Sequence, residues 1–111
     1  MANSQKLKII KNIPFKYLDV NWVIKYVDEI PSNKDNFFFG QTHYDKREIW
    51  IATKLNGSPI PLITQSRTLY HELVHVILSE GQYDTESANE PLVEWIGKSL
   101  YNLIQNRDLF K

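Results

Sequence analysis

The chain has 111 residues, 13 basic and 13 acidic side chains and therefore no formal net charge. This length suits one domain with a modest core, so we expect residues 1–111 to form a single domain. The balanced charge disfavours a nucleic-acid or anionic-membrane partner, and the absence of cysteine excludes disulfides and a thiolate metal site while fitting a reducing cytoplasm.

The first part of the chain predicts one helix and no membrane segment. The apolar run Ile9-Ile10 is too short for a signal or membrane-spanning segment, and Leu7–Ile10 is a candidate for a short strand or an ordered arm. Asp19 can cap a helix that continues to Ile30 and is stopped by Pro31. Helical spacing of apolar residues supports that helix: Val20, Val23, Ile24, Val27 and Ile30.

The middle of the chain predicts a β-hairpin. Two segments, Phe37–His43 and Glu48–Thr53, have the composition of strands and are joined by a turn near Asp45-Lys46. In the second segment isoleucine alternates with other residues, so we expect one face of this strand to be buried. The turn-rich stretch Asn56–Pro59 then leads to the next element.

A helix is predicted after the two prolines Pro59 and Pro61, which block any earlier start. Thr64 or Ser66 can cap this helix, and Gly81 can end it. Four apolar residues mark the face expected to pack inward: Leu69, Leu73, Val76 and Ile77.

The predicted helix carries the sequence His71-Glu72-Leu73-Val74-His75, an H-E-x-x-H motif. Residues four apart lie on one helical face, so the imidazoles of His71 and His75 can bind one tetrahedral zinc ion. Glu72 can then reach a water on that metal and act as the general base of a metal-assisted hydrolysis. The motif predicts His71 and His75 as metal ligands and Glu72 as the catalytic residue.

A second helix is expected from Glu90 to Asn106, with Asn89 as its N-cap and Pro91 in its first turn. Six of its apolar residues are expected to face largely inward, and Trp95 is expected in the core beside them. The six are Leu92, Val93, Ile96, Leu100, Leu103 and Ile104.

A third zinc ligand must come from beyond the motif helix, because a catalytic zinc site usually has three protein ligands and one open position. No histidine follows His75, so a carboxylate is expected. Glu90 and Glu94 are four apart and share a helical face, from which either could point at the metal. A tight antiparallel helix hairpin favours Glu94, whereas a loop that folds back before Asn89 favours Glu90.

These motifs resemble a known family. The motif helix followed by Asn89-Glu90 resembles the gluzincin branch of zinc metallopeptidases, whose third ligand is a glutamate on the next helix. The span from Phe38 to Leu103 resembles small H-E-x-x-H proteins of bacteriophages and mobile elements, related in style to the ImmA/IrrE metallopeptidases. The matching stretches are Gly40–Thr53, Thr68–Glu80 and Asn89–Tyr101.

The resemblance implies Glu90 as the third zinc ligand, with Glu94 as the alternative. Pro91, directly after the implied ligand, departs from the family pattern. In zincins of this kind an edge strand runs beside the metal cleft, so the resemblance implies that Phe37–His43 binds a substrate backbone by strand addition.

The order of helix, hairpin, motif helix and second helix predicts an α+β fold. We expect a minimal zincin-like domain with a small antiparallel sheet packed on the H-E-x-x-H helix and the C-terminal helix. The expected function is a cytoplasmic zinc metallopeptidase, bacterial or phage-encoded, that acts on a protein or peptide. The alternatives are a zinc-binding module that binds a host protein without cleaving it, and a structural domain whose motif is coincidental.

Other side chains are weaker candidates for the site. His43 could stabilise an oxyanion, but a polar residue at a hairpin end is the favoured interpretation. Several tyrosines could also donate to an oxyanion, although packing with the hydroxyl at the surface is favoured for each. These are Tyr44, Tyr70, Tyr83 and Tyr101.

Overall fold

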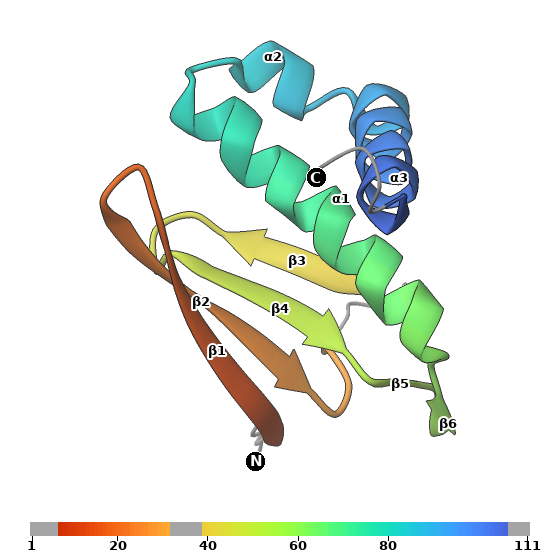
Figure 1. Cartoon of the computed structure of the whole chain (residues 1–111). Coiled ribbons are helices and arrows are strands. Elements are labelled where there is room, and N and C mark those ends of the chain that lie inside the picture. The colour runs from red at the N-terminus through yellow and green to blue at the C-terminus, as the bar shows by residue number, and fades with distance from the viewer. Residues whose placement is uncertain (1–6, 32–38, 107–111) are drawn as a thin grey trace.

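A four-stranded mixed sheet carries helices on one face in the computed structural model, which describes residues 7–31 and 39–106 (Figure 1). The α+β prediction is therefore confirmed. The strands of this sheet are β1 (Ile9–Tyr17), β2 (Val20–Val27), β3 (Gly40–His43) and β4 (Glu48–Ala52). Two short strands, β5 (Lys54–Leu55) and β6 (Ser58–Pro59), pair separately. The helices are α1 (Leu62–Glu80), α2 (Asp84–Ser87) and α3 (Glu90–Gln105).

The segment predicted as the first helix is a strand, so the helix from Asp19 to Ile30 is wrong. Strands β1 and β2 form an antiparallel hairpin whose two loop residues, Leu18 and Asp19, have φ of 51° and 65°. Positive φ at both loop residues matches the tight turn that suits twisted strands. The apolar residues here fit a helical period, but Trp22 and Ile24 also alternate, and both are buried.

The sheet has the order β1-β2-β4-β3, and β2 runs parallel to β4. The expected all-antiparallel sheet is therefore wrong, because the prediction had no strand at β2 to pair with β4. The predicted hairpin of β3 and β4 is confirmed, with His43 paired to Glu48 at its closed end. Residues 37 and 38 of the predicted first strand lie outside the described residues.

Helix α1 crosses one face of the sheet and encloses the core between them (Figure 1). Trp22 and Ile24 of β2 pack there against Val76 of α1, together with two isoleucines of β4, Ile49 and Ile51. Both isoleucines have no exposed surface, which confirms the predicted alternation of β4.

The ends of the long helices follow their local sequence in most respects. Helix α1 ends before Gly81, as predicted, but it begins directly after Pro61, earlier than the predicted cap. Thr64 and Ser66 lie inside the helix, so the prediction that one of them caps it is wrong. At α3, Asn89 caps the helix as predicted, because its side-chain oxygen accepts the Leu92 N–H at 3.1 Å.

Helix α3 packs on α1 with less of its apolar surface than expected. Val93 and Gly97 are buried, but Trp95 is 65% exposed, so its predicted place in the core is wrong. Leu103 and Ile104 are 50% and 42% exposed, contrary to their predicted inward orientation. A Cβ at Gly97 would lie 3.1 Å from the Cα of His71, so the helices approach each other closely beside the motif.

Glycine also permits the contact between β3 and α1. A Cβ at Gly40 would lie 2.6 Å from Cγ2 of Thr68 and 3.2 Å from Cγ of Glu72. Real Cβ atoms essentially never approach another atom as closely as 2.6 Å, so any larger residue at position 40 must move the strand or the Thr68 side chain.

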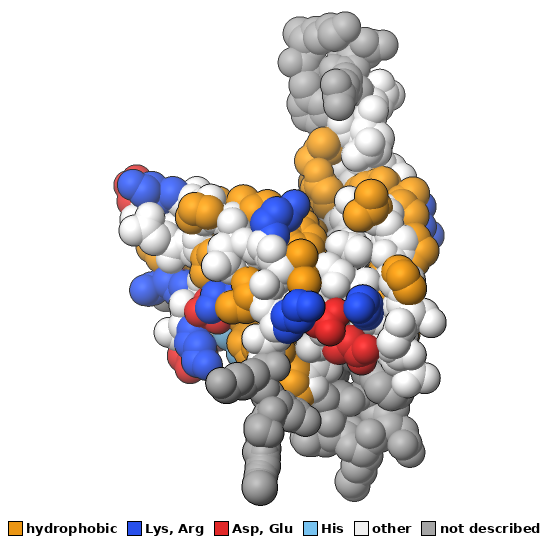
Figure 2. Space-filling view, turned by 90° about the horizontal axis from the view of Figure 1, so that it is seen from below, with side chains coloured by type: hydrophobic (Ala, Val, Ile, Leu, Met, Phe, Trp, Pro, Cys, Tyr) orange, Lys and Arg blue, Asp and Glu red, His pale blue; other side chains and the backbone are white. Residues whose placement is uncertain are grey.

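The surface carries both signs of charge. Seen from below, basic and acidic side chains lie beside one another and form no extended field of one sign (Figure 2). Within residues 7–31 and 39–106, no helix is both long and apolar enough to cross a membrane.

We predict that Gly40→Ala lowers the free energy of unfolding by about 1–3 kcal/mol, because the added methyl overpacks the contact between β3 and α1. Thr68→Ser removes the clashing Cγ2 while it keeps the hydroxyl that donates to the Thr64 carbonyl at 2.8 Å. The double variant should therefore recover part of the loss in urea unfolding. A Gly40→Ala protein as stable as the wild type would contradict this account of the packing.

Candidate metal centre

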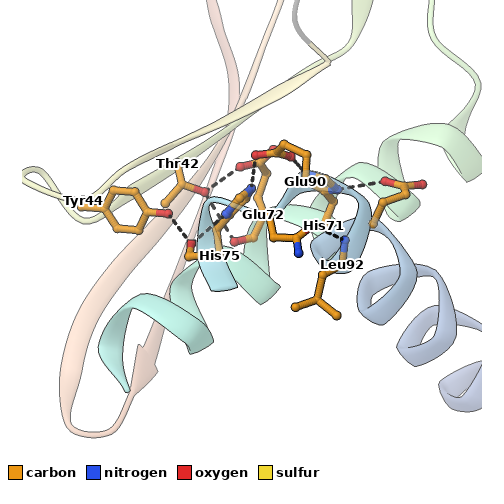
Figure 3. A network of polar contacts seen from close by, with 10 residues as sticks. Thr42, Tyr44, His71, Glu72, His75, Glu90 and Leu92 are labelled. Atoms are coloured by element: carbon orange, nitrogen blue, oxygen red, sulfur yellow. Dashed lines mark hydrogen bonds and ion pairs between the residues drawn. The ribbon is translucent and has the colours of Figure 1, made fainter. Parts of the chain in front are cut away.

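Three side chains converge at the junction of α1 and α3 (Figure 3). His71 and His75 lie one turn apart on α1, and Glu90 is the first residue of α3. One ligand atom from each residue lies within 4.8 Å of the other two. The structure therefore brings together the three predicted metal ligands.

Both imidazoles present the same ring nitrogen to Glu90. Nε2 of His71 lies 3.0 Å from Oε1 of Glu90, and Nε2 of His75 lies 3.3 Å from Oε2. The two ring centroids are 5.0 Å apart. The carboxylate thus spans the gap between the histidines, as the spacing of four on one helix allows.

The other ring nitrogens contact polar side chains behind the centre. Nδ1 of His71 lies 2.9 Å from Oε1 of Glu94, and Nδ1 of His75 lies 3.0 Å from Oγ of Ser87. Such contacts fix ring orientation and the tautomer of histidines that bind metals. Glu94, the alternative ligand, therefore lies on the opposite side of the His71 ring from Glu90.

The contacts of His71 with the two glutamates favour a positive charge between His71 and Glu90. When Nδ1 of His71 donates its proton to Glu94, Nε2 carries a lone pair that faces a Glu90 oxygen 3.0 Å away. Two facing acceptors repel each other unless a proton or a metal ion lies between them. Two imidazole nitrogens and a carboxylate are also a donor set that divalent transition metals accept, so this group could bind a metal ion.

Glu72 lies beside the histidines with its carboxylate held from the sheet. The side chain is only 7% exposed, and Oγ1 of Thr42 donates to its Oε1 at 2.7 Å. Burial raises the pKa of Glu72, while the Thr42 hydrogen bond and the nearby His71 and His75 oppose that rise. The carboxylate is thus oriented by one donor and shielded from bulk water.

Two hollows meet at Glu72 and form a groove along the edge of β3. Their volumes are about 460 and 580 Å³, within the range of ligand sites. Both are lined by Gly40, His71 and Glu72. The Arg67 hollow adds Phe39, Thr64, Arg67, Thr68 and Glu94. The Tyr44 hollow adds Gln41, Thr42, His43, Tyr44, His75 and Glu90.

The ring of His43 is engaged outside the centre. It lies on Trp50 with centroids 4.0 Å apart, and its Nε2 contacts the Gln41 side chain at 3.1 Å. Because neighbouring residues of a strand face opposite ways, His43 and Thr42 point to opposite sides of the sheet. Burial and the charge of Lys46 lower the pKa of His43. These contacts favour the interpretation of His43 as a packed residue at the hairpin end.

The candidate tyrosines differ in their distance from the centre. The hydroxyl of Tyr44 lies 3.5 Å from Oγ of Ser87, which places it behind His75. Tyr70 and Tyr101 pack edge to face between α1 and α3, with centroids 5.6 Å apart. Tyr83 is exposed after the end of α1.

Several residues of the centre were not identified from the sequence. Ser87 lies in α2, between the motif and Glu90, where serine has no distinctive spacing. Thr42 is 30 positions before Glu72, and no local pattern connects the two. Gly97 is seven residues after Glu90 and therefore lies on the same face of the helix. This spacing is the signal from which a role of Gly97 beside the centre could have been predicted.

The chain matches no protein-family model, no curated protein and no solved structure in the three comparisons. The assignment of the centre therefore depends on its own geometry and on the motif.

We predict that the purified protein binds about one divalent metal ion per chain, and that His71→Ala, His75→Ala and Glu90→Ala each abolish this binding. Added metal should raise the melting temperature of the wild type, because a ligand of the folded state stabilises it, and should leave these variants unchanged. Elemental analysis and thermal denaturation measure both effects. His43→Ala is the matched control and should bind metal like the wild type, since its ring contacts Trp50 and Gln41.

We predict a different result for Glu94→Ala. Loss of a carboxylate that orients a ligand typically weakens metal affinity by about 10–100-fold without removing the site. A competition titration against a metal-binding dye should therefore give full stoichiometry with a weaker dissociation constant. Complete loss in Glu94→Ala together with normal binding in Glu90→Ala would exchange the roles of the two residues.

Proposed function

We propose that this protein is a zinc-dependent metallopeptidase with Glu72 as its general base. The observation that carries the proposal is the convergence of three potential metal ligands beside a buried carboxylate, at a groove that follows a sheet edge. The resemblance to small H-E-x-x-H proteins of phages and mobile elements supports it, as does a cysteine-free chain suited to a bacterial cytoplasm.

Zinc is the proposed metal because two histidines and one glutamate are a common ligand set of catalytic zinc sites. When bound, zinc supplies a Lewis acid that polarises a carbonyl group and lowers the pKa of water towards neutrality. His71, His75 and Glu90 would hold the ion. Glu94 and Ser87 would keep the two imidazoles oriented through their Nδ1 atoms.

Glu72 is the proposed proton-transfer group. The Thr42 hydroxyl occupies one side of its carboxylate, and the carboxylate borders both hollows. A buried carboxylate with a raised pKa is a better proton acceptor than an ordinary glutamate. In the proposed reaction it takes a proton from the attacking water and delivers a proton to the leaving amine.

Strand β3 is the proposed binding edge for the substrate backbone. It is the last strand on its side of the described sheet. The Ala52 N–H donates to the Phe39 carbonyl at 2.9 Å, so alternation along an antiparallel pair turns the backbone groups of Gly40 and Thr42 outward. An extended peptide could pair with these groups beside Glu72. The proposed substrate is therefore a protein or peptide in an extended conformation.

We predict that Glu72→Gln keeps zinc but hydrolyses no peptide bonds, because the amide cannot accept the proton from water. The zinc-loaded wild type should cleave peptides in a proteome-derived library, with the cut sites identified by mass spectrometry. Glu80→Gln is the matched control, since Glu80 is exposed at the end of α1 and should not affect cleavage.

Two results would contradict this function. Equal cleavage by the wild type and Glu72→Gln would remove Glu72 from its role. Stoichiometric zinc without cleavage of any library peptide would favour the alternative, a zinc-binding module that binds a partner protein without hydrolysing it.

A further inference from the structure

The positively charged side chain of Arg67 lines the same hollow as His71 and Glu72, which belong to the proposed catalytic site. Arg67 lies four residues before His71 on α1, so the two side chains share a helical face. The hollow extends from Arg67 to Glu72 and is one part of the groove along β3. A substrate side chain in this hollow would lie close to the bond presented to Glu72.

Arg67 contacts an aromatic ring on the neighbouring helix. Its guanidinium carbon lies 5.5 Å from the centroid of the Tyr101 ring on α3, a cation–π distance. Tyr70 packs edge to face on Tyr101 and fixes this ring between the helices. A contact with the ring face leaves the N–H donors at the rim of the guanidinium able to bind a further group.

Within the described part of the chain, Arg67 makes no ion pair. Two carboxylates line the same hollow, and each has another described partner. Glu94 contacts Nδ1 of His71 at 2.9 Å, and Glu72 accepts a hydrogen bond from Oγ1 of Thr42 at 2.7 Å. The remaining lining around Arg67 is neutral, with Phe39, Thr64 and Thr68 among it. Because both carboxylates of the hollow contact other described residues, the planar guanidinium of Arg67 is available among residues 7–31 and 39–106 to match a carboxylate on a substrate.

We propose that Arg67 selects a carboxylate on the substrate next to the cleaved bond, either an acidic side chain or a free C-terminus. This inference is built on the proposed peptidase function and adds the class of substrate to it. Arg67 acts here as a specificity residue, because it contacts the substrate and takes no part in proton transfer.

Binding can test this preference independently of cleavage. Zinc-loaded Glu72→Gln protein would be immobilised and exposed to a random peptide library with free and amidated C-termini, and the retained peptides sequenced. We expect enrichment of Asp and Glu at one position, or of free C-termini, which also distinguishes the two sources of the carboxylate. The same selection with Glu72→Gln/Arg67→Gln should show no such enrichment.

The affinity of one selected peptide gives the magnitude. Replacement of its acidic residue by the matching amide, or of its free C-terminus by an amide, should weaken binding about fivefold, as should Arg67→Gln. The two changes together should weaken binding no further, because they remove the same contact. Arg67→Lys should recover part of the affinity. Lys98→Gln is the matched control, since Lys98 is exposed on α3 and lines neither hollow.

The outcomes separate this inference from the proposed function. No enrichment of acidic groups, or the same enrichment without Arg67, would overturn the role of Arg67 even if the wild type cleaves the library. Failure to retain any peptide would overturn it as well. Arg67-dependent enrichment without cleavage by the wild type would support the carboxylate site and count against the peptidase.

Discussion

The close approach of α3 to α1 at Gly97 is the constraint on which the candidate centre depends. The absence of a side chain at Gly97 brings α3 against the backbone of His71. Glu90, Glu94 and Gly97 occur at intervals of four and three, so they share the helical face that is turned to α1. The close contact at Gly97 therefore helps to bring both carboxylates to His71. Because Glu90 and Glu94 are one turn apart, they contact different nitrogens of the His71 ring.

Much of this centre could be predicted from the sequence, because its parts lie on helices with clear local signals. The H-E-x-x-H spacing identifies one face of α1, and Asn89 with Pro91 identifies the start of α3. The choice between Glu90 and Glu94 required the distance and angle between two helices, which no periodic pattern contains. The hydrogen bond from Thr42 to Glu72 depends on how the sheet lies against α1. The position of Thr42 in the sequence therefore gave no sign of this contact.

The fold was predicted less well where two patterns overlap in the same residues. Val20, Val23, Ile24 and Val27 fit a helical face, yet the β-branched side chains and a second partner strand favour the strand β2. The apolar character of Trp95 also misled the prediction, because Trp95 lies on the side of α3 opposite the buried Val93 and Gly97 and is exposed. In both cases the arrangement of elements distant in sequence decides the outcome and outweighs the local sequence pattern.

The Thr42 hydroxyl connects the sheet edge mechanically to the Glu72 carboxylate. The residue has two roles in the structure: its side chain orients the carboxylate, and its backbone faces outward on the edge strand. A peptide paired along β3 would therefore stiffen the same strand that holds Glu72. Occupation of the groove and alignment of the proposed proton acceptor would in this way be coupled through a single residue, so that a ligand too short to reach Thr42 would leave the carboxylate less firmly oriented.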